Sequence, residues 1–252
     1  MRQKTLASGL LLYPVIITMI FLYGGCTSKT EELGMAEKYD DAIQLMDKGR
    51  FASAVPLFQS IIEQNPGTRY AAYSYLKIGD AHVLADDGKE DEAETNYRIF
   101  LNFNSYSHLV PYVMSRLMEL NYKRNTSFFF GKDYEYSRDP EHFKKIINEY
   151  QRFYFLYPNS LYLKDAEKYL NYSIEALAEH ELLIGDWYYD HALFDQAISR
   201  YRYIMKEYPN FDGWKRVVEK LITAYRKNQQ PQLADEFQRV YEQKLKQISS
   251  GG

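Results

Sequence analysis

The single cysteine of the chain, Cys26, follows a segment whose composition suits modification by lipid. A basic start leads into an apolar run over residues 6–22, and two glycines stand immediately before the cysteine. A basic start, an apolar middle and small residues at the exit are the parts of a bacterial signal peptide. Only a sulfur nucleophile accepts a diacylglycerol thioether, and small neighbours let the modifying enzymes approach the backbone. The pattern therefore predicts a signal peptide over residues 1–25 and lipid attachment at Cys26.

The same apolar run has an alternative interpretation as an uncleaved membrane-spanning anchor. Its roughly 17 residues are at the lower limit of what crosses a hydrocarbon core of about 30 Å. On the lipoprotein interpretation, residues 26–32 form a lipidated tether, and several acyl chains on one residue give stable anchoring. Position 27 is threonine and lacks the aspartate that retains many lipoproteins in the inner membrane, so the expected location is the periplasmic face of the outer membrane.

Composition and missing motifs exclude several other classes of protein. One cysteine among 252 residues permits no internal disulfide and no cysteine-based zinc site. A net charge of -3 and an isoelectric point near 6.0 lack the basic surface of a nucleic-acid binder. The chain has no glycine-rich phosphate loop, HExxH, GxSxG or dinucleotide motif, and its five histidines are scattered. We therefore expect no catalytic residue, no bound metal and no cofactor.

Residues of the same chemical type recur along the chain at steps of 9, 3, 4 and 8 positions. Two units keep all the steps: Ala42, Phe51, Ala54, Phe58 and Pro66, and then Gly185, Phe194, Ala197, Tyr201 and Pro209. Three partial copies are Ala93 with Tyr97; Phe143, Ile146, Tyr150 and Pro158; and Leu221, Ala224, Tyr225 and Ala234. The pattern resembles the tetratricopeptide (TPR) repeat, a helix-turn-helix unit of 34 residues. It predicts an all-α protein, an α-solenoid of about five irregular TPR repeats.

Each residue type in this pattern has a structural reason. A small residue lets the two helices of a repeat cross closely, and a proline ends the second helix. The aromatic residue is expected to fill the gap to the next repeat.

The spacing between repeats shows that the array is irregular. Ala93 and Ile146 lie 53 positions apart, and Ile146 and Ala197 lie 51 apart. We assign the first excess to an insertion over 123–142. The second is assigned to one long helix from Leu161 to about Tyr189, about 43 Å in length at 1.5 Å per residue. The expected organisation is repeats 1–3 in 33–160, the long helix with repeats 4–5 in 161–248, and a disordered tail at 249–252.

Two groups of apolar residues are candidates for binding a partner. Tyr39, Ile43 and Met46 lie on the first helix of repeat 1, which in a solenoid lines the concave face. They either form a groove for an extended peptide or contact the neighbouring repeat. Phe128, Phe129 and Phe130 in the insertion either fix it to the array or meet a partner.

Several local strings resemble the BamD family of outer-membrane protein assembly factors. They are Gly49–Ala54 with Asn65-Pro66, Phe129–Asp133 continuing to Ser137–His142, Tyr157–Ser160, and Glu207–Pro209. The resemblance covers essentially the whole chain after the signal segment. It implies a non-enzymatic scaffold in the BAM complex, which folds and inserts β-barrel proteins.

The resemblance also implies specific partners. These are the POTRA domains of the barrel-forming subunit BamA, other BAM lipoproteins, and unfolded outer-membrane proteins. Arg200 matches an arginine that the family uses at the BamA interface. Two alternatives stay open at this point: a pilotin-like TPR lipoprotein that escorts secretin subunits, and a peptidoglycan-acting enzyme with a catalytic carboxylate in a cleft.

Overall fold

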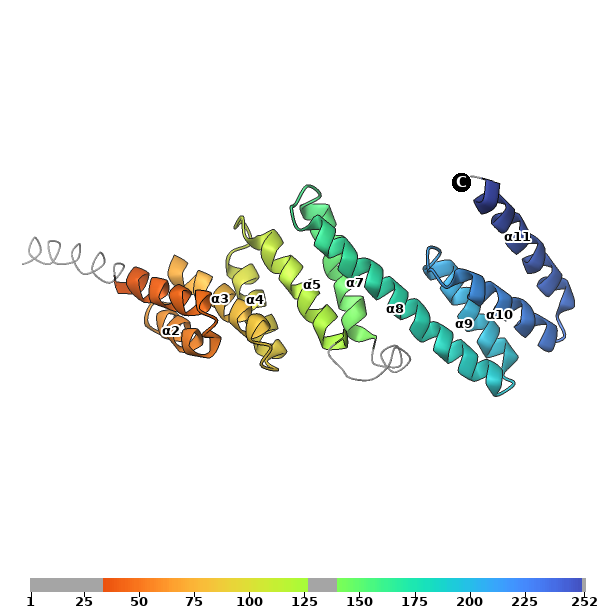
Figure 1. The fold of residues 1–252 in the computed structure, drawn as a ribbon, viewed down its shortest axis with the longest axis horizontal. Helices are drawn as coiled ribbons and strands as arrows, with labels where there is room; N and C mark the ends of the chain where they lie inside the picture. The colour runs from red at the N-terminus through yellow and green to blue at the C-terminus, as the bar shows by residue number, and fades with distance from the viewer. Residues whose placement is uncertain (1–33, 127–139, 251–252) are drawn as a thin grey trace, which may run out of the picture. The chain divides into compact units, whose positions relative to one another are not determined.

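The computed structural model describes residues 34–126 and 140–250, and over these ranges it contains ten helices and no strand. Residues 34–47 form the first helix. The others are α2 (Phe51–Gln64), α3 (Arg69–Ala85), α4 (Glu90–Phe103), α5 (Val110–Thr126), α7 (Glu141–Leu156), α8 (Leu163–Asp190), α9 (Phe194–Glu207), α10 (Trp214–Lys227) and α11 (Pro231–Ser250). Successive helices pack in pairs (Figure 1), so the fold is the expected all-α array of five TPR-like repeats.

Contacts between helices divide the described residues into two compact units, those up to Ser107 (unit 1) and those from His108 onward (unit 2). This differs from the expected division between residues 160 and 161. The reason is that α5 packs against both α7 and α8, so the third repeat shares its contacts with the long helix that follows. At the other end of unit 2, α11 continues to Ser250, two residues into the expected tail, because no glycine or proline stands between Pro231, its first residue, and Gly251.

The core of unit 1 uses the residues that the repeat pattern identifies. Ala42, Ala54 and Phe58 are fully buried, and they pack with Ile61 and Ile78. The small alanines permit the close approach of the first helix and α2. The predicted role of the small repeat residue is confirmed here.

Prolines stand just after the ends of three helices, and a glycine with positive φ stands in the turn between α3 and α4. Pro66, Pro158 and Pro209 each stand two positions after the end of a helix. Between α3 and α4, Gly88 adopts a φ of 75° in the turn. The first turn of α4 carries three carboxylates, which interact favourably with the helix dipole: Glu90, Asp91 and Glu92.

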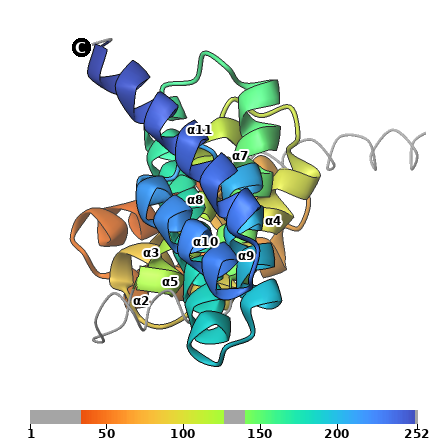
Figure 2. The same cartoon turned by 90° about the vertical axis from the view of Figure 1, so that its right-hand side faces the viewer.

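The organising element of unit 2 is α8, a helix of 28 residues and about 42 Å. Phe143 of α7 packs against Ala176 and Leu177 of α8, and α9 covers the part of α8 nearer its C-terminus (Figure 1). Figures 1 and 2 both show α9 beside α10, and these two helices share a buried cluster with Ala178 and Leu182 of α8. Thus α8 packs against α7 of the third repeat and also against α9 of its own repeat.

Within the described ranges, none of the helices combines the length and apolar character needed to cross a bilayer. The apolar run over 6–22 lies outside these ranges, as do Cys26, Phe128, Phe129 and Phe130.

Candidate partner-binding site

Arg200 lies on α9 and is held by a carboxylate of α8. Its Nη1 donates a hydrogen bond of 2.8 Å to Oε2 of Glu181. The hydrogen bond to Glu181 raises the pKa of Arg200 above its ordinary value, although partial burial acts in the opposite direction. The Arg200 side chain is 40% exposed and that of Glu181 is 18% exposed. The ion pair therefore fixes the direction of the guanidinium while leaving part of it open to solvent.

A glycine of α8 allows α9 to approach closely enough for this contact. A Cβ at Gly185 would lie 2.6 Å from Cε1 of Tyr201 and 3.3 Å from Cβ of Arg200. The hydroxyl of Tyr201 donates a 2.8 Å hydrogen bond to Oδ1 of Asp186. Burial is the main cause that raises the pKa of Tyr201, and the bond to Asp186 adds to it. The missing side chain at Gly185 thus lets the ring of Tyr201 pack against α8, and this close approach brings Arg200 beside Glu181.

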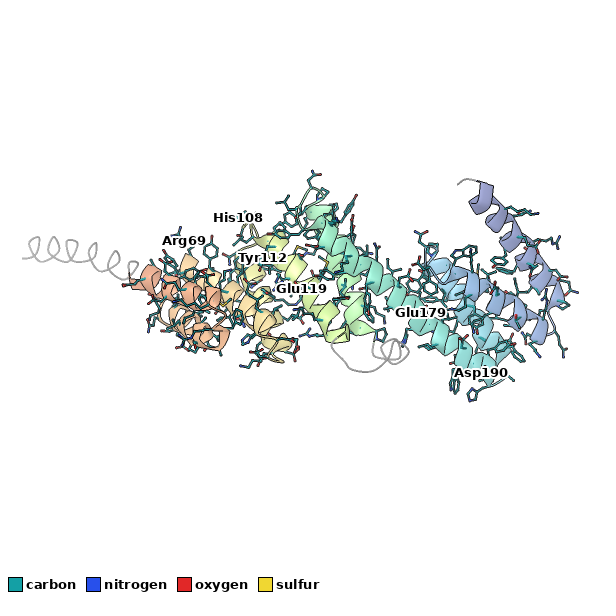
Figure 3. All side chains as sticks on the ribbon, viewed as in Figure 1. Arg69, His108, Tyr112, Glu119, Glu179 and Asp190 are labelled. Carbon is teal, nitrogen blue, oxygen red and sulfur yellow. The ribbon has the colours of Figure 1, made fainter. Side chains whose placement is uncertain are left out.

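Carboxylates of α8 also hold the start of the next repeat. Glu179, in the middle of α8 (Figure 3), forms an ion pair with Arg216 of α10, and Asp186 pairs with Nζ of Lys220 at 3.0 Å. The backbone N–H of Asp212 donates to Oε1 of Glu175 at 3.1 Å. Charged side chains of α8 thus bind both α9, which carries Arg200, and α10, which packs beside α9. These contacts fix the position of the helix surface around Arg200.

A shallow cavity of about 240 Å³ opens beside these ion pairs. It is lined by Tyr189, Tyr201, Arg216, Glu219, Lys220 and Thr223. Its volume is below the range of about 300–1,000 Å³ typical of small-molecule sites, and its two cations are paired with carboxylates of α8. In the described part of the chain, no group of three or more His, Cys, Asp or Glu side chains is placed to hold a metal ion.

A half-exposed arginine with a fixed orientation can recognise a second carboxylate. Charge-assisted bonds to a guanidinium are stronger than neutral hydrogen bonds, and their planar geometry adds specificity. Because Glu181 already restricts the Arg200 side chain, a partner carboxylate meets a group that loses little freedom on binding.

The groove candidates of the first repeat lie in unit 1 and are partly buried. The ring centroid of Tyr39 is 5.5 Å from that of Phe58 and 5.6 Å from that of Tyr70. Burial raises the pKa of Tyr39 to about 12, with a smaller contribution from the charge of Asp80. Ile43 and Met46 pack against the same buried cluster. The structure thus brings the three residues together, in contact with α2 and α3.

The sequence pattern missed the residues that orient the aromatic side chains. In unit 1 the hydroxyl of Tyr97 donates to Oδ1 of Asp80 at 2.9 Å, and a Cβ at Gly79 would lie 2.6 Å from Tyr97 Cε1. This is the arrangement of Gly185, Asp186 and Tyr201 in unit 2. Both aromatic residues pack against the first helix of their own repeat. Tyr201 also lies beside α10 of the next repeat, where it lines the cavity with Arg216 and Lys220. The tripeptide Ile-Gly-Asp, at 78–80 and 184–186, was the available signal.

Comparisons with known proteins cover nearly the whole chain. The family model YfiO, described as an outer membrane lipoprotein, matches residues 31–240. The outer membrane protein assembly factor BamD of Xylella fastidiosa (strain Temecula1) is 26% identical over 247 residues, which cover 95% of this chain and 83% of that protein. BamD of Vibrio cholerae serotype O1 is 25% identical over 245 residues, covering 95% and 96%. A solved structure of MamA aligns with a TM-score of 0.35 and 16% identity over 86% of this chain and 94% of that one. With its family model matched from residue 31 to residue 240, the chain belongs to the YfiO family of outer membrane lipoproteins, the family that includes these BamD proteins.

Proposed function

We propose that the protein is a non-enzymatic scaffold of the BAM complex that assists the folding and insertion of β-barrel proteins at the outer membrane. The observation that carries this proposal is the family match over residues 31–240, together with BamD relatives aligned over most of their length. An array of helix pairs supports it, because such arrays present extended surfaces for other proteins. Lipid on Cys26 anchors the scaffold to the periplasmic face of the membrane.

Docking on the POTRA domains of a BamA-like protein is assigned to the surface around Arg200. This guanidinium is oriented by Glu181, and 40% of the side chain is exposed. Tyr39, Ile43 and Met46 of unit 1 remain candidates for contact with unfolded outer-membrane proteins, and Phe128, Phe129 and Phe130 for contact with a partner such as an accessory BAM lipoprotein.

Co-purification from detergent-solubilised outer membranes tests the docking. The unmodified protein is expected to bring down a large β-barrel protein that carries periplasmic domains. Arg200→Ala should reduce the amount recovered by about tenfold or more, since truncating one partner of a desolvated charge pair costs about 2–5 kcal/mol. Arg200→Lys should restore it only in part, because an ammonium lacks the planar group that can bind a partner carboxylate through two parallel hydrogen bonds.

Arg202→Ala is the matched control, since Arg202 is an exposed arginine two positions further along α9. It should leave recovery unchanged. Recovery of a secretin in place of the barrel protein, or of no partner at all, would contradict the proposed function. Equal loss with Arg200→Ala and Arg202→Ala would contradict the role of Arg200 alone.

The lipid anchor has its own test. Cys26→Ser should release the protein from the membrane fraction into the soluble periplasmic fraction. A Cys26→Ser protein that stays in the membrane fraction would favour a spanning segment over a lipid.

A further inference from the structure

One edge of unit 1 is formed by the start of the first helix, the turn between α2 and α3, and the end of α4. A cavity of about 450 Å³ lies between the first helix and the end of α2. It is lined by Gly34, Met35, Lys38, Ile61, Gln64 and Asn65. A second cavity of about 360 Å³ joins the start of α3 to the end of α4, with Thr68 and Phe103 on its two sides. Residues 34–38, 64–69 and 102–107 thus lie along one edge, which we call the tether edge because residues 26–33 lead into it.

Two aromatic side chains of the tether edge face solvent. Phe103 is 76% exposed and Tyr106 is fully exposed. The turn that carries them is fixed: the backbone N–H and the side-chain amide of Asn104 both donate to the carbonyl of Phe100, at 2.9 and 3.0 Å. The N–H of Ser107 donates to the carbonyl of Asn104 at 2.9 Å. The fold therefore presents both rings outward on an ordered turn.

The charges of unit 1 are distributed unevenly between its two edges. Residues 64–69 and 102–107 contain no aspartate or glutamate, and Arg69, at the start of α3 (Figure 3), is their only charged residue. The opposite edge, where the first helix and α3 end and α2 and α4 begin, carries six carboxylates and three cations. The carboxylates are Asp47, Asp86, Asp87, Glu90, Asp91 and Glu92, and the cations are Lys48, Arg50 and Lys89. The 17 residues of α3 separate the two edges by about 26 Å.

The distance along the chain between Cys26 and the tether edge is short. Eight positions separate Cys26 from Gly34, which at about 3.5 Å per residue limit the reach to about 28 Å. With lipid on Cys26, the tether edge is confined near the membrane surface and contacts lipid as an intramolecular event. Aromatic side chains with an apolar body and, in tyrosine, a polar end favour the headgroup region of a bilayer. Carboxylates lose solvation there. Neither 64–69 nor 102–107 carries one, and the exposed Glu37 is the one carboxylate of the third segment, 34–38.

We propose that the tether edge rests on the lipid headgroups of the membrane, with Phe103 and Tyr106 inserted into the interfacial region and the acidic edge turned toward the aqueous side. This proposal depends on the lipid anchor of the proposed function. It assigns to unit 1 a fixed orientation on the membrane, set by three features of one edge: the tether, the two exposed rings and the absence of carboxylates from 64–69 and 102–107.

The test uses the lipidated full chain in vesicles of phosphatidylethanolamine and phosphatidylglycerol. Because Cys26 is blocked by its thioether, a cysteine introduced by Phe103→Cys or Tyr106→Cys is the only free thiol and can carry an environment-sensitive fluorophore. Leu84→Cys is the matched control, since Leu84 is a 55% exposed apolar residue near the acidic edge of the same unit. Nitroxide-labelled lipid in the same vesicles then measures the proximity of each fluorophore to the bilayer, and flotation measures anchoring.

We expect the fluorophores at 103 and 106 to be quenched several-fold more strongly than the fluorophore at 84. Equal or negligible quenching at all three positions, in protein that floats with the vesicles, would overturn this inference and leave the lipid anchor intact. Failure to float would contradict the anchor itself and with it the orientation. A change in fluorescence at 103 that requires an extended peptide from an unfolded outer-membrane protein, and that vesicles do not produce, would make the tether edge a peptide site and would also overturn the inference.

Discussion

The hydroxyl of Tyr97 donates a 2.9 Å hydrogen bond to Oδ1 of Asp80, and both residues are buried between α3 and α4. Tyr201 forms the corresponding 2.8 Å bond to Asp186 in unit 2. In both units a glycine immediately before the aspartate provides the space for the aromatic ring. The same tyrosine–aspartate hydrogen bond therefore links the two helices of the second repeat and the two helices of the fourth. The number of residues between the aspartate and the tyrosine differs between the two repeats.

Removing the hydroxyl of Tyr97 should destabilise unit 1. Tyr97→Phe keeps the ring and removes one hydrogen bond from the buried carboxylate of Asp80. Hydrogen bonds to charged groups contribute about 1.5–3 kcal/mol, so we expect a loss of about that size. Hydrogen exchange of the amides of α3 and α4, at increasing urea concentration, measures the stability of this unit separately.

Tyr106→Phe is the control for this change, because Tyr106 is fully exposed in the same unit. Its effect should stay within about 0.5 kcal/mol, as for most surface substitutions. If both variants lost the same stability, the Tyr97–Asp80 bond would have no special role.

Adding a methyl group at Gly185 should loosen the contact between α8 and α9. The new Cβ would lie 2.6 Å from Cε1 of Tyr201, whose ring is buried and held by Asp186. Overpacking costs about 1–3 kcal/mol, and alanine recovers about 1 kcal/mol in helix propensity, so Gly185→Ala should be destabilising on balance. We expect faster hydrogen exchange of the backbone amides of α9 and a lower melting temperature in thermal unfolding.

Gly34→Ala provides the comparison, because a Cβ at Gly34 has no heavy atom within 4 Å. That variant should melt at the temperature of the unmodified protein or slightly above it, since it gains helix propensity without a steric clash. A Gly185→Ala protein as stable as the unmodified chain would show that the ring of Tyr201 can move aside.

The stability of unit 1 should fall at high pH because of Tyr39. Burial, and to a smaller extent the charge of Asp80, raises the pKa of Tyr39 from 10.0 to about 12 in the folded state. A raised pKa means that the unfolded chain releases the proton first, so the contribution of this group is complete below pH 10 and is lost as the pH rises toward 12.

Tyr39→Phe removes this titration, and the urea midpoint of unit 1 should then fall less between pH 9 and pH 11.5. Tyr106→Phe should behave like the unmodified protein. Parallel pH profiles for the unmodified chain and Tyr39→Phe would show that the ionisation of Tyr39 does not contribute.

Replacing the carboxylate that orients Arg200 should weaken docking without removing it. Glu181→Gln keeps the size of the side chain and a hydrogen-bond acceptor, but it removes the charge that faces Arg200. Recovery of the barrel partner should fall to a level between those of the unmodified protein and Arg200→Ala. Stability should change by no more than about 1 kcal/mol, because the pair is partly exposed.

Glu179→Gln tests whether any carboxylate of α8 has the same effect, since Glu179 pairs with Arg216 and not with Arg200. It should leave recovery close to that of the unmodified protein. Equal recovery with Glu181→Gln and the unmodified protein would show that Arg200 needs no orienting carboxylate.

The repeat pattern could be predicted because small, aromatic and proline residues respond to local helix geometry. Ala54, Phe58 and Pro66 mark the close crossing, the buried ring and the end of α2, and the same types at the same steps mark α9. The long helix was also predictable, since the segment before Asp190 has no proline and continuous helical spacing of apolar residues.

The contacts between side chains of different helices within each unit were harder to predict from the sequence. Tyr97 follows Gly79 by 18 positions, whereas Tyr201 follows Gly185 by 16, so a search at fixed steps finds only the second pair. For Tyr39, the helix face was predictable, but the packing of α2 and α3 on that face depends on tertiary contacts. The ion pair of Arg200 with Glu181 joins residues 19 positions apart on two helices, and no local pattern encodes it.

The length of α8 determines more than the separation of the helices packed on it. An α-helix advances by about 100° per residue, so inserting one residue between Leu177 and Glu179 would turn the C-terminal part of α8 by that angle relative to the part that contacts α7. Glu181, Gly185 and Asp186 would then leave the side that faces α9. The residue count of this one helix thus sets the angular phase between two repeats, and we expect insertions or deletions there to be tolerated far less than substitutions.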